Sequence, residues 1–176
     1  YSQAVLEAIA GFARANDLWI WSDEVYEGIV FAGAATPMAQ VAPERTFSVY
    51  SFSKTYGMAG NRCGYIVGPT PDIMGSVRKA TVHHYYSACT ASQLAAAAVL
   101  ERGQPWLTTA VQHYRAAGIR AADRLGVPHP EGGTFLFIDV SESLDGRGLQ
   151  GFLEDCIDRG LILAPGSSCG QAFGGH

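Results

Sequence analysis

The chain of 176 residues has few charged residues and no basic segment. Charged residues make up 16% of it, and 12 Lys and Arg stand against 16 Asp and Glu, which gives a formal net charge of −4. Binding to the phosphate backbone of a nucleic acid depends on clustered positive charge. We therefore expect no nucleic-acid partner.

Cysteine and long apolar runs are also scarce. The four cysteines stand far apart, with no CxxC pair: Cys63, Cys89, Cys156 and Cys169. Zinc sites and disulfide frameworks show closer or repeated spacings, so we expect reduced thiols in a cytoplasmic protein and no metal site. The longest apolar run, 94–100, is far shorter than the roughly 20 residues that span a bilayer, so we expect no membrane partner.

Apolar residues are abundant, at 48%, which is enough to bury a sizeable core. The first residue is not Met, and the last ones, 173–176, form a glycine-rich loop without a closing element. We expect the sequence to be missing a part on both sides.

Helical and strand patterns alternate along the chain. Ser2 is placed to cap a helix whose apolar residues recur at helical spacing, and Thr70 is placed to cap another that begins with Pro71. Strands are predicted at 18–21, 46–52, 64–68, 134–140 and 161–164, and further helices at 92–102, 106–125 and 149–159. Short apolar strands between helices indicate an α/β fold with a sheet buried on both faces.

A segment rich in proline and glycine, 127–133, interrupts this pattern. We predict a domain boundary there. Residues 1–126 would form the C-terminal part of a large domain, and residues 127–176 the beginning of a small α+β domain.

Two predicted strands are followed by polar residues that could bind a ligand or take part in catalysis. The first segment is WSDEVY, with Asp23 and Tyr26, and the second is SFSKTYGMAGNRCGY, which holds Lys54 and Arg62. Ligands in open α/β sheets bind outside the carboxyl ends of the strands, where both segments would lie. Glycines in the second segment allow the backbone to turn tightly around a small anion.

This combination matches the needs of pyridoxal 5′-phosphate (PLP). A lysine can form a Schiff base with the cofactor, and Arg62 with the hydroxyls of Ser51 and Ser53 can hold its phosphate. A carboxylate such as Asp23 can keep the pyridine nitrogen protonated, so that the ring accepts electrons. Of the two serines, we expect Ser51 to be the phosphate ligand and Ser53 to cap the turn.

Taken together, SDEVY and SFSKTYGMAGNRCGY resemble the fold-type-I aminotransferases of class I and II, and PEGGTFLFIDV and LAPGSSCG fit the small domain of that family. The resemblance implies an aspartate aminotransferase-like PLP-transferase fold: a large domain with a mostly parallel sheet, followed by the start of a small α+β domain. It also implies a homodimer.

The resemblance assigns a role to each site residue. Lys54 forms the Schiff base and is the catalytic residue, Asp23 pairs with the pyridinium nitrogen, and Tyr26 donates to the ring oxygen. Ser51, Ser53 and Arg62 hold the phosphate. The implied activity is transfer of an amino group between an amino acid and a 2-oxo acid. Family members are longer, and their Asn-Pro-x-Gly segment and substrate-binding arginine lie outside this sequence.

Two other activities use the same scaffold. A PLP-dependent lyase or synthase is one alternative, although lyases of this group often show Asp-Glu-Ile-His where this chain has DEVY. A PLP-binding sensor module of a transcription regulator is the other. The HHYY segment at 83–86 is expected at the surface or a subunit interface, because adjacent histidines on a helix make a poor chelate.

Overall fold

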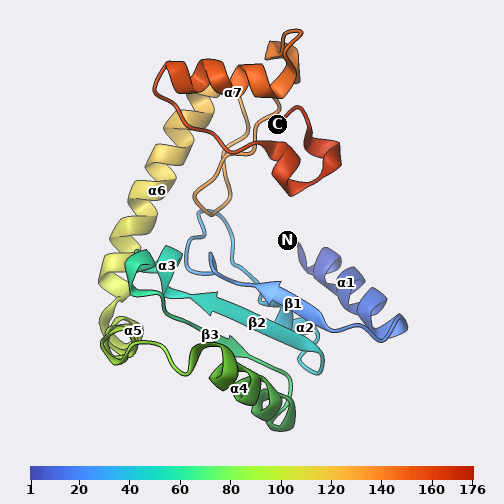
Figure 1. Cartoon of the computed structure of the whole chain (residues 1–176), viewed down its shortest axis with the longest axis vertical. Helices are drawn as coiled ribbons and strands as arrows, with labels where there is room; N and C mark the ends of the chain where they lie inside the picture. The colour runs from blue at the N-terminus through green and yellow to red at the C-terminus, as the bar shows by residue number, and fades with distance from the viewer. The chain divides into compact units, whose positions relative to one another are not determined.

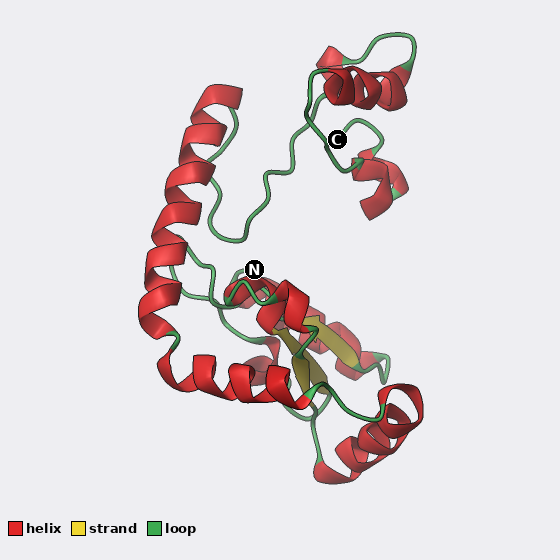
Figure 2. Ribbon diagram, turned by 60° about the vertical axis from the view of Figure 1, so that its left-hand side comes forward, coloured by secondary structure: helices red, strands yellow, loops and turns green.

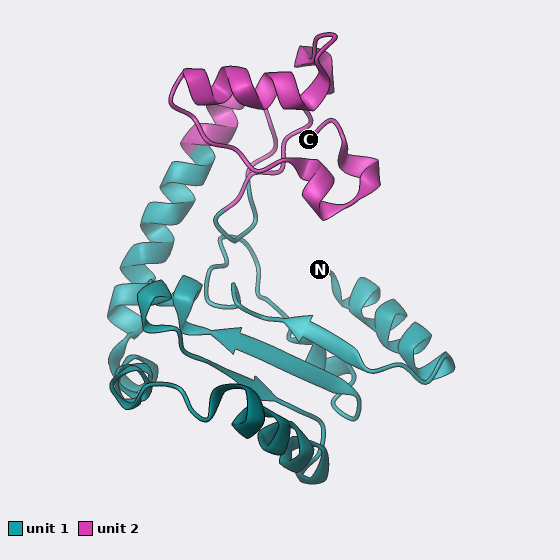
Figure 3. Cartoon of the chain, viewed as in Figure 1, with its two compact units in different colours: residues 1–119, 130–134 teal, residues 120–129, 135–176 magenta.

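A computed structural model describes the whole chain, Tyr1–His176. The chain divides into two compact units, which Figure 3 colours separately: residues 1–119 with 130–134 form unit 1, and residues 120–129 with 135–176 form unit 2. Helix α6 (Gln104–Leu125) contributes residues to both units. The domain boundary after residue 126 stays a prediction.

Unit 1 is built on a three-stranded sheet in the order β1-β2-β3 (Figure 1). The strands are β1 (Ile20–Asp23), β2 (Thr46–Ser51) and β3 (Gly64–Val67). β1 and β2 are parallel, whereas β2 and β3 are antiparallel. The sheet is therefore mixed, and the turn that joins its antiparallel pair carries the SFSK sequence.

Two helices of unit 1, α1 (Gln3–Ala15) and α4 (Pro71–Tyr85), begin where the sequence predicts caps. Ser2 accepts a hydrogen bond from the Val5 N–H at 3.4 Å, and Thr70 accepts one from the Ile73 N–H at 3.3 Å, directly before Pro71. Further helices of unit 1 are α2 (Met38–Val41), α3 (Phe52–Thr55) and α5 (Thr90–Arg102). No helix of the chain has the combination of length and apolar character that a membrane span requires.

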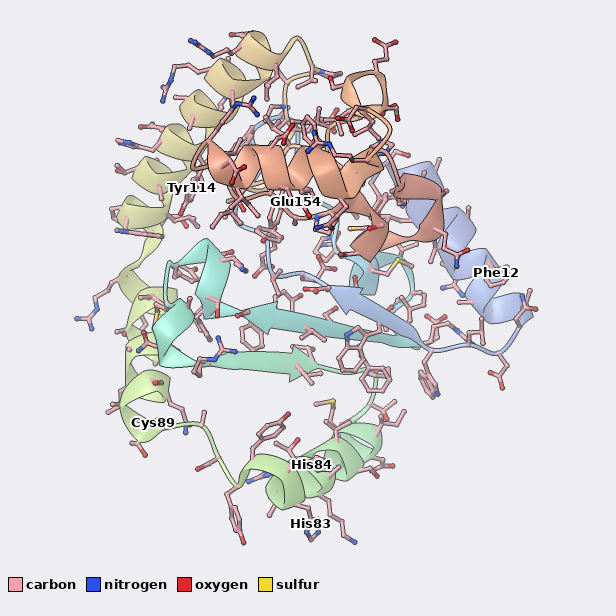
Figure 4. All side chains as sticks on the ribbon, turned by 45° about the horizontal axis from the view of Figure 1, so that its top comes forward. Phe12, His83, His84, Cys89, Tyr114 and Glu154 are labelled. Carbon is pink, nitrogen blue, oxygen red and sulfur yellow. The ribbon has the colours of Figure 1, made fainter.

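The core of unit 1 forms where α1 and α2 meet the sheet. Leu6 and Ala10 of α1 pack with Met38 and Ala42, and Ile20 of β1 lies against them. Only part of the apolar pattern of α1 is used, because a helix buries the stripe that faces its neighbours. Phe12, which the same pattern includes, is 64% exposed and is labelled on α1 in Figure 4.

Arg45, at the start of β2, closes the end of α1. Its Nη1 donates to the carbonyl oxygens of Ala13 at 3.1 Å and Leu18 at 2.8 Å. Ala13 lies in the last turn of α1, where carbonyls lack a partner within the helix, and its oxygen also accepts from the Leu18 N–H at 2.9 Å. The guanidinium adds a second bond there and interacts well with the helix dipole. The Arg45 side chain is only 18% exposed.

Arg45→Met is expected to lower the free energy of unfolding by about 1–3 kcal/mol, because the Leu18 carbonyl loses its donor and the Ala13 carbonyl keeps only the Leu18 N–H, while the aliphatic stem is kept. Urea unfolding followed by circular dichroism measures this change. Arg78→Met is the matched control, because Arg78 is exposed on α4. An equal loss of stability in both variants would show that Arg45 has no special part in holding α1.

Unit 2 contains helix α7 (Gly148–Asp158) and the short 3-10 turns Ser141–Ser143, Gly166–Cys169 and Gln171–Phe173. The strands predicted at 134–140 and 161–164 are wrong: both segments are irregular, and in Figure 2 the strands lie only in the sheet of unit 1. A strand needs a neighbour to pair with its N–H and C=O groups. The backbone bonds of 134–140 lie at its end: the Val140 N–H donates to the Gly175 carbonyl at 2.8 Å, and the Val140 carbonyl accepts from the Ser143 N–H at 2.8 Å. These two bonds do not form a ladder.

Apolar residues of those two segments instead line a groove of about 770 Å³ against α7, with Phe137, Ile138, Phe152 and Leu163 among its walls. Consecutive residues of each segment line this groove, so the apolar pattern marks burial of both segments and not one face of a strand. It does not create a ladder by itself.

Candidate functional site

The carboxyl ends of β1 and β2 lie at the same edge of the sheet, because the two strands are parallel. Asp23 is the last residue of β1 and pairs with Val49 of β2. The Glu24 N–H donates to the Val49 carbonyl at 2.9 Å and so continues the ladder past the strand. Ser51 ends β2, and Lys54 follows in α3. The structure therefore brings the two sequence segments to one edge, as predicted.

The side chains of Asp23 and Glu24, at the end of β1, lie in different surroundings. Side chains of successive strand residues point to opposite faces. Glu24 is half-buried, and its Oε1 accepts from the Ser22 hydroxyl at 2.8 Å and from the Met38 N–H at 3.3 Å. Asp23 is exposed and accepts only a local bond, from the Val25 N–H at 3.3 Å. Glu24 thus holds the loop in place, and Asp23 is the carboxylate that a ligand can reach.

Tyr26 lies in the same turn, half-buried. The turn is closed by the Glu27 N–H, which donates to the Glu24 carbonyl at 3.0 Å, and by the Ile29 N–H, which donates to the Tyr26 carbonyl at 2.9 Å. These bonds fix the backbone of Tyr26 close to Asp23. They do not by themselves assign a role to its phenol.

Ser51 is the N-cap of α3, contrary to the expectation that Ser53 caps this turn. The Ser51 backbone is extended, with φ −139° and ψ 137°, and its Oγ accepts from the Ser53 N–H at 3.1 Å. A cap must precede the helix in an extended conformation, and Ser53 lies inside the helix. The hydroxyl of Ser51 still has its own proton to donate, so both serines can serve a phosphate.

Lys54 is exposed in the last turn of α3, while its neighbour Thr55 and the first residue of the helix, Phe52, are each 4% exposed. A turn follows the lysine, in which the Gly57 N–H donates to the Lys54 carbonyl at 3.2 Å. Gly57 has φ +64°, which glycine adopts without steric cost. The base of Lys54 is therefore anchored, and its side chain is accessible.

Arg62 stands at the end of the same connection, in the left-handed region with φ 49° and ψ 50°. That conformation is costly for a residue with a Cβ and is often found at functional sites. Its Nη1 donates to the Ala59 carbonyl at 3.0 Å, and the exposed guanidinium has further N–H groups to offer. Directly after this turn, Gly64 pairs with Ser51. A Cβ on Gly64 would come within 2.5 Å of the Tyr50 carbonyl oxygen, so only glycine fits.

Aromatic rings pack beside this connection. Tyr50 of β2 and Tyr65 of β3 are stacked with ring centroids 4.6 Å apart. Burial raises the pKa of both phenols above their usual range, and the nearby charge of Glu27 raises the two pKa values further. Burial, and then the charge of Glu24, also raises the pKa of the Glu27 carboxyl. The two phenols therefore stay neutral at ordinary pH and supply packing rather than charge.

The contact that ties the two segments together was not predicted from the sequence. The Thr55 hydroxyl donates to the Val25 carbonyl at 3.2 Å, and Gly28 lies against the Thr55 side chain. No motif relates Thr55 to Val25 and Gly28, from which it is about 30 residues away in the sequence. The one available signal is that Thr55 directly follows the lysine.

The HHYY segment ends α4 at the surface, as expected, and Figure 4 labels His83 and His84 there. The Nδ1 of His84 lies 3.0 Å from the Ala80 carbonyl oxygen. No group of three or more His, Cys, Asp or Glu side chains in the structure is arranged to hold a metal ion, and the four cysteines are unpaired.

Lys54 follows one of two parallel strands, and Asp23 ends the other at the same edge of the sheet. The model of the family "Aminotransferase class I and II" matches residues 1–173. The chain belongs to this family, which confirms the resemblance found in the sequence.

Curated relatives of the chain are transaminases by name. It is 31% identical to the arginine–pyruvate transaminase of Pseudomonas aeruginosa over 99% of its own length and 46% of that protein. It is 32% identical to the aromatic-amino-acid aminotransferase 2 of Thermococcus litoralis over 97% of its own length and 46% of that protein. The chain thus spans about half the length of these relatives.

Solved structures confirm the fold. The N-succinyldiaminopimelate aminotransferase of Mycobacterium tuberculosis superposes with a TM-score of 0.82 at 26% identity, over 95% of this chain and 45% of that one. A mutant aspartate aminotransferase of Thermus thermophilus gives a TM-score of 0.82 at 27% identity, over 95% and 47%. The α/β, aspartate aminotransferase-like fold class predicted from the sequence is therefore correct.

Proposed function

We propose that the protein is a PLP-dependent aminotransferase, in which Lys54 holds the cofactor as a Schiff base and an amino group passes between an amino acid and a 2-oxo acid. The observation that carries this proposal is the meeting of two segments at the carboxyl edge of the sheet. Lys54 comes from one and Asp23 from the other. Membership of the aminotransferase family supports it.

The side chains at this edge fit PLP by their chemistry. A phosphate needs hydroxyl and guanidinium donors, an aldehyde needs an amine, and a pyridinium nitrogen needs a carboxylate. The segment between β2 and β3 supplies the phosphate donors and the amine. The turn after β1 supplies the carboxylate and a phenol. The residues in these proposed roles are Ser51, Ser53 and Arg62 for phosphate, Lys54 for the aldehyde, Asp23 for the ring nitrogen and Tyr26 for the ring oxygen.

The proposed chemistry divides between these residues. Bound PLP supplies the electron sink that stabilises negative charge on the α-carbon of a substrate. The carboxylate of Asp23 keeps the ring nitrogen protonated by charge pairing. The Lys54 amine would remove and return the proton at the α-carbon of the substrate, a role worth roughly 10²–10⁴ in rate.

The oligomeric state, the cellular location and the domain division are also part of the proposal. We infer a homodimer located in the cytoplasm, with residues 1–126 in a large PLP-binding domain and residues 127–176 in a small one. The relatives named above as transaminases support amino acids and 2-oxo acids as the substrates.

Two half-reactions measured on the protein in its natural length test the function. We expect an amino acid to remove the visible–near-UV absorbance of the bound cofactor and a 2-oxo acid to restore it, with a new amino acid as the product, as ping-pong kinetics require. A panel of amino donors against a few 2-oxo acids identifies the pair. Release of ammonia without amino-acid formation would instead indicate a lyase, and a bound cofactor that no amino acid converts would indicate a sensor module.

A further inference from the structure

Helix α3, which carries Lys54, has only four residues. A single helical turn is not stable by itself, because fixing its backbone costs more than its few hydrogen bonds return. Its position must come from contacts with the rest of unit 1. The placement of Lys54 relative to Asp23 therefore depends on whatever joins α3 to the turn after β1.

Contacts within the connection cannot set that placement. The Ser51 cap and the bond from the Gly57 N–H to the Lys54 carbonyl join parts of the same connection. These bonds fix the conformation of the segment between β2 and β3, but they do not fix the position of that segment relative to β1. The bond from the Glu24 N–H to the Val49 carbonyl fixes the two strands, and it lies before α3 begins.

Thr55 supplies a hydrogen bond between α3 and the turn after β1. Successive residues on a helix point about 100° apart, and here Thr55 is 4% exposed whereas Lys54 is exposed. The inward Thr55 hydroxyl donates to the Val25 carbonyl at 3.2 Å. Val25 lies between Asp23 and Tyr26 in the turn that carries both. This bond thus sets the rotation of α3 and its distance from that turn.

The methyl group of Thr55 is held as closely as its hydroxyl. A Cβ added to Gly28 would come within 2.5 Å of Thr55 Cγ2 and 3.2 Å of Leu107 Cδ2. Gly28 therefore lets the turn approach α3 to a distance that any larger residue would prevent. Both branches of the Thr55 side chain meet the segment that follows Asp23.

We propose that Thr55 is a positioning residue, whose hydroxyl bond to the Val25 carbonyl holds the Lys54 amine in register with the carboxylate of Asp23. This inference rests on the proposed role of Lys54. Its consequence is that the loss of one hydroxyl, outside the groups that touch the cofactor, slows the reaction of Lys54 with PLP more than it weakens the initial binding of PLP.

The test uses Thr55→Val, which keeps the size and a methyl against Gly28 but removes the donor, and Thr55→Ser, which keeps the donor. Thr81→Val is the matched control, because the Thr81 hydroxyl also bonds a carbonyl, that of Val77 at 2.9 Å, on the exposed part of α4. Melting temperatures are recorded for all variants.

PLP is the probe, added to the protein at a series of concentrations. The Lys54 amine attacks the aldehyde carbon, a C=N bond forms, and the aldehyde oxygen leaves as water; borohydride then reduces the C=N bond to a stable amine. Absorbance gives the rate at saturating PLP and the concentration for half-saturation, and peptide mass spectrometry locates the adduct.

We expect Thr55→Val to lower the saturating rate roughly tenfold while the half-saturation concentration changes little, because misplacing a reacting group by a fraction of an ångström acts on the reaction step. Thr55→Ser should react at close to the rate of the unsubstituted protein, and Thr81→Val at the same rate.

Three results would overturn the inference. These are an unchanged rate in Thr55→Val, an equal loss of rate in Thr55→Val and Thr55→Ser, and a loss that appears only in proportion to a lowered melting temperature. If the unsubstituted protein forms a Lys54 adduct, these results overturn the role of Thr55 alone. The absence of any Lys54 adduct in the unsubstituted protein would overturn the proposed function and this inference together.

Discussion

Lys54→Ala is expected to abolish covalent attachment of PLP to this protein. The exposed amine of Lys54 is the proposed Schiff-base partner, and alanine offers no nucleophile in its place. The absorbance band of the Schiff base should be absent, and borohydride should leave no pyridoxyl group on the peptide that contains residue 54. Because the same amine is the proposed proton carrier, turnover in the protein of natural length should fall by at least about 10²-fold.

The sequence provides a clean control, because its other lysine is Lys79. Lys79 is exposed on α4, so nonspecific reaction of PLP with an accessible amine would modify it as well. We expect Lys79→Ala to keep the absorbance band and the full adduct on Lys54. A band and an adduct that survive Lys54→Ala and disappear in Lys79→Ala would contradict the assignment.

Asp23→Asn is expected to give the second large effect, a fall in turnover of about 10²–10³-fold with the fold intact. Asparagine keeps the size of the side chain and an oxygen that can accept from the Val25 N–H, as Asp23 Oδ1 does at 3.3 Å. It removes the negative charge that would hold the proton on the ring nitrogen. Steady-state kinetics on the protein of natural length, with melting temperatures alongside, measure the effect.

Asp17→Asn is the matched control for this variant. The Asp17 side chain is fully exposed, and its φ of 50° is one that asparagine also tolerates. We expect its turnover to equal that of the unsubstituted protein. If Asp23→Asn retained full turnover, the pyridinium partner would have to be another group, and the two-segment site would lose its carboxylate.

The positions of β2, β3 and the caps of α1 and α4 follow from local sequence, whereas β1 lies two residues further along than the predicted 18–21. Ser2 and Thr70 cap because their hydroxyls precede apolar helical patterns, and the sheet strands are short apolar runs between turns. Such features depend on residues close in sequence. The expected meeting of Asp23 and Lys54 at one edge is also predictable, since it needs only that their strands be neighbours.

Features that depend on a partner elsewhere in the fold were predicted less well. The segments 134–140 and 161–164 are apolar like strands, yet pairing requires a neighbour that local sequence cannot supply. Ser51 and Ser53 both suit a cap, and the backbone conformation at Ser51 decided between them. Phe12 fits the apolar stripe of α1, but the place of α2 left it exposed.

The sequence by itself determined the family and the residue types of the site, because SDEVY and SFSKTYGMAGNRCGY carry their chemistry in side chains whose order and spacing are visible without a structure. Only the tertiary structure decided how the two segments are held together. The bond from Thr55 to Val25 and the close approach at Gly28 join residues that no periodicity relates. Such contacts arise where folded elements pack, and packing is a property of the whole arrangement in space.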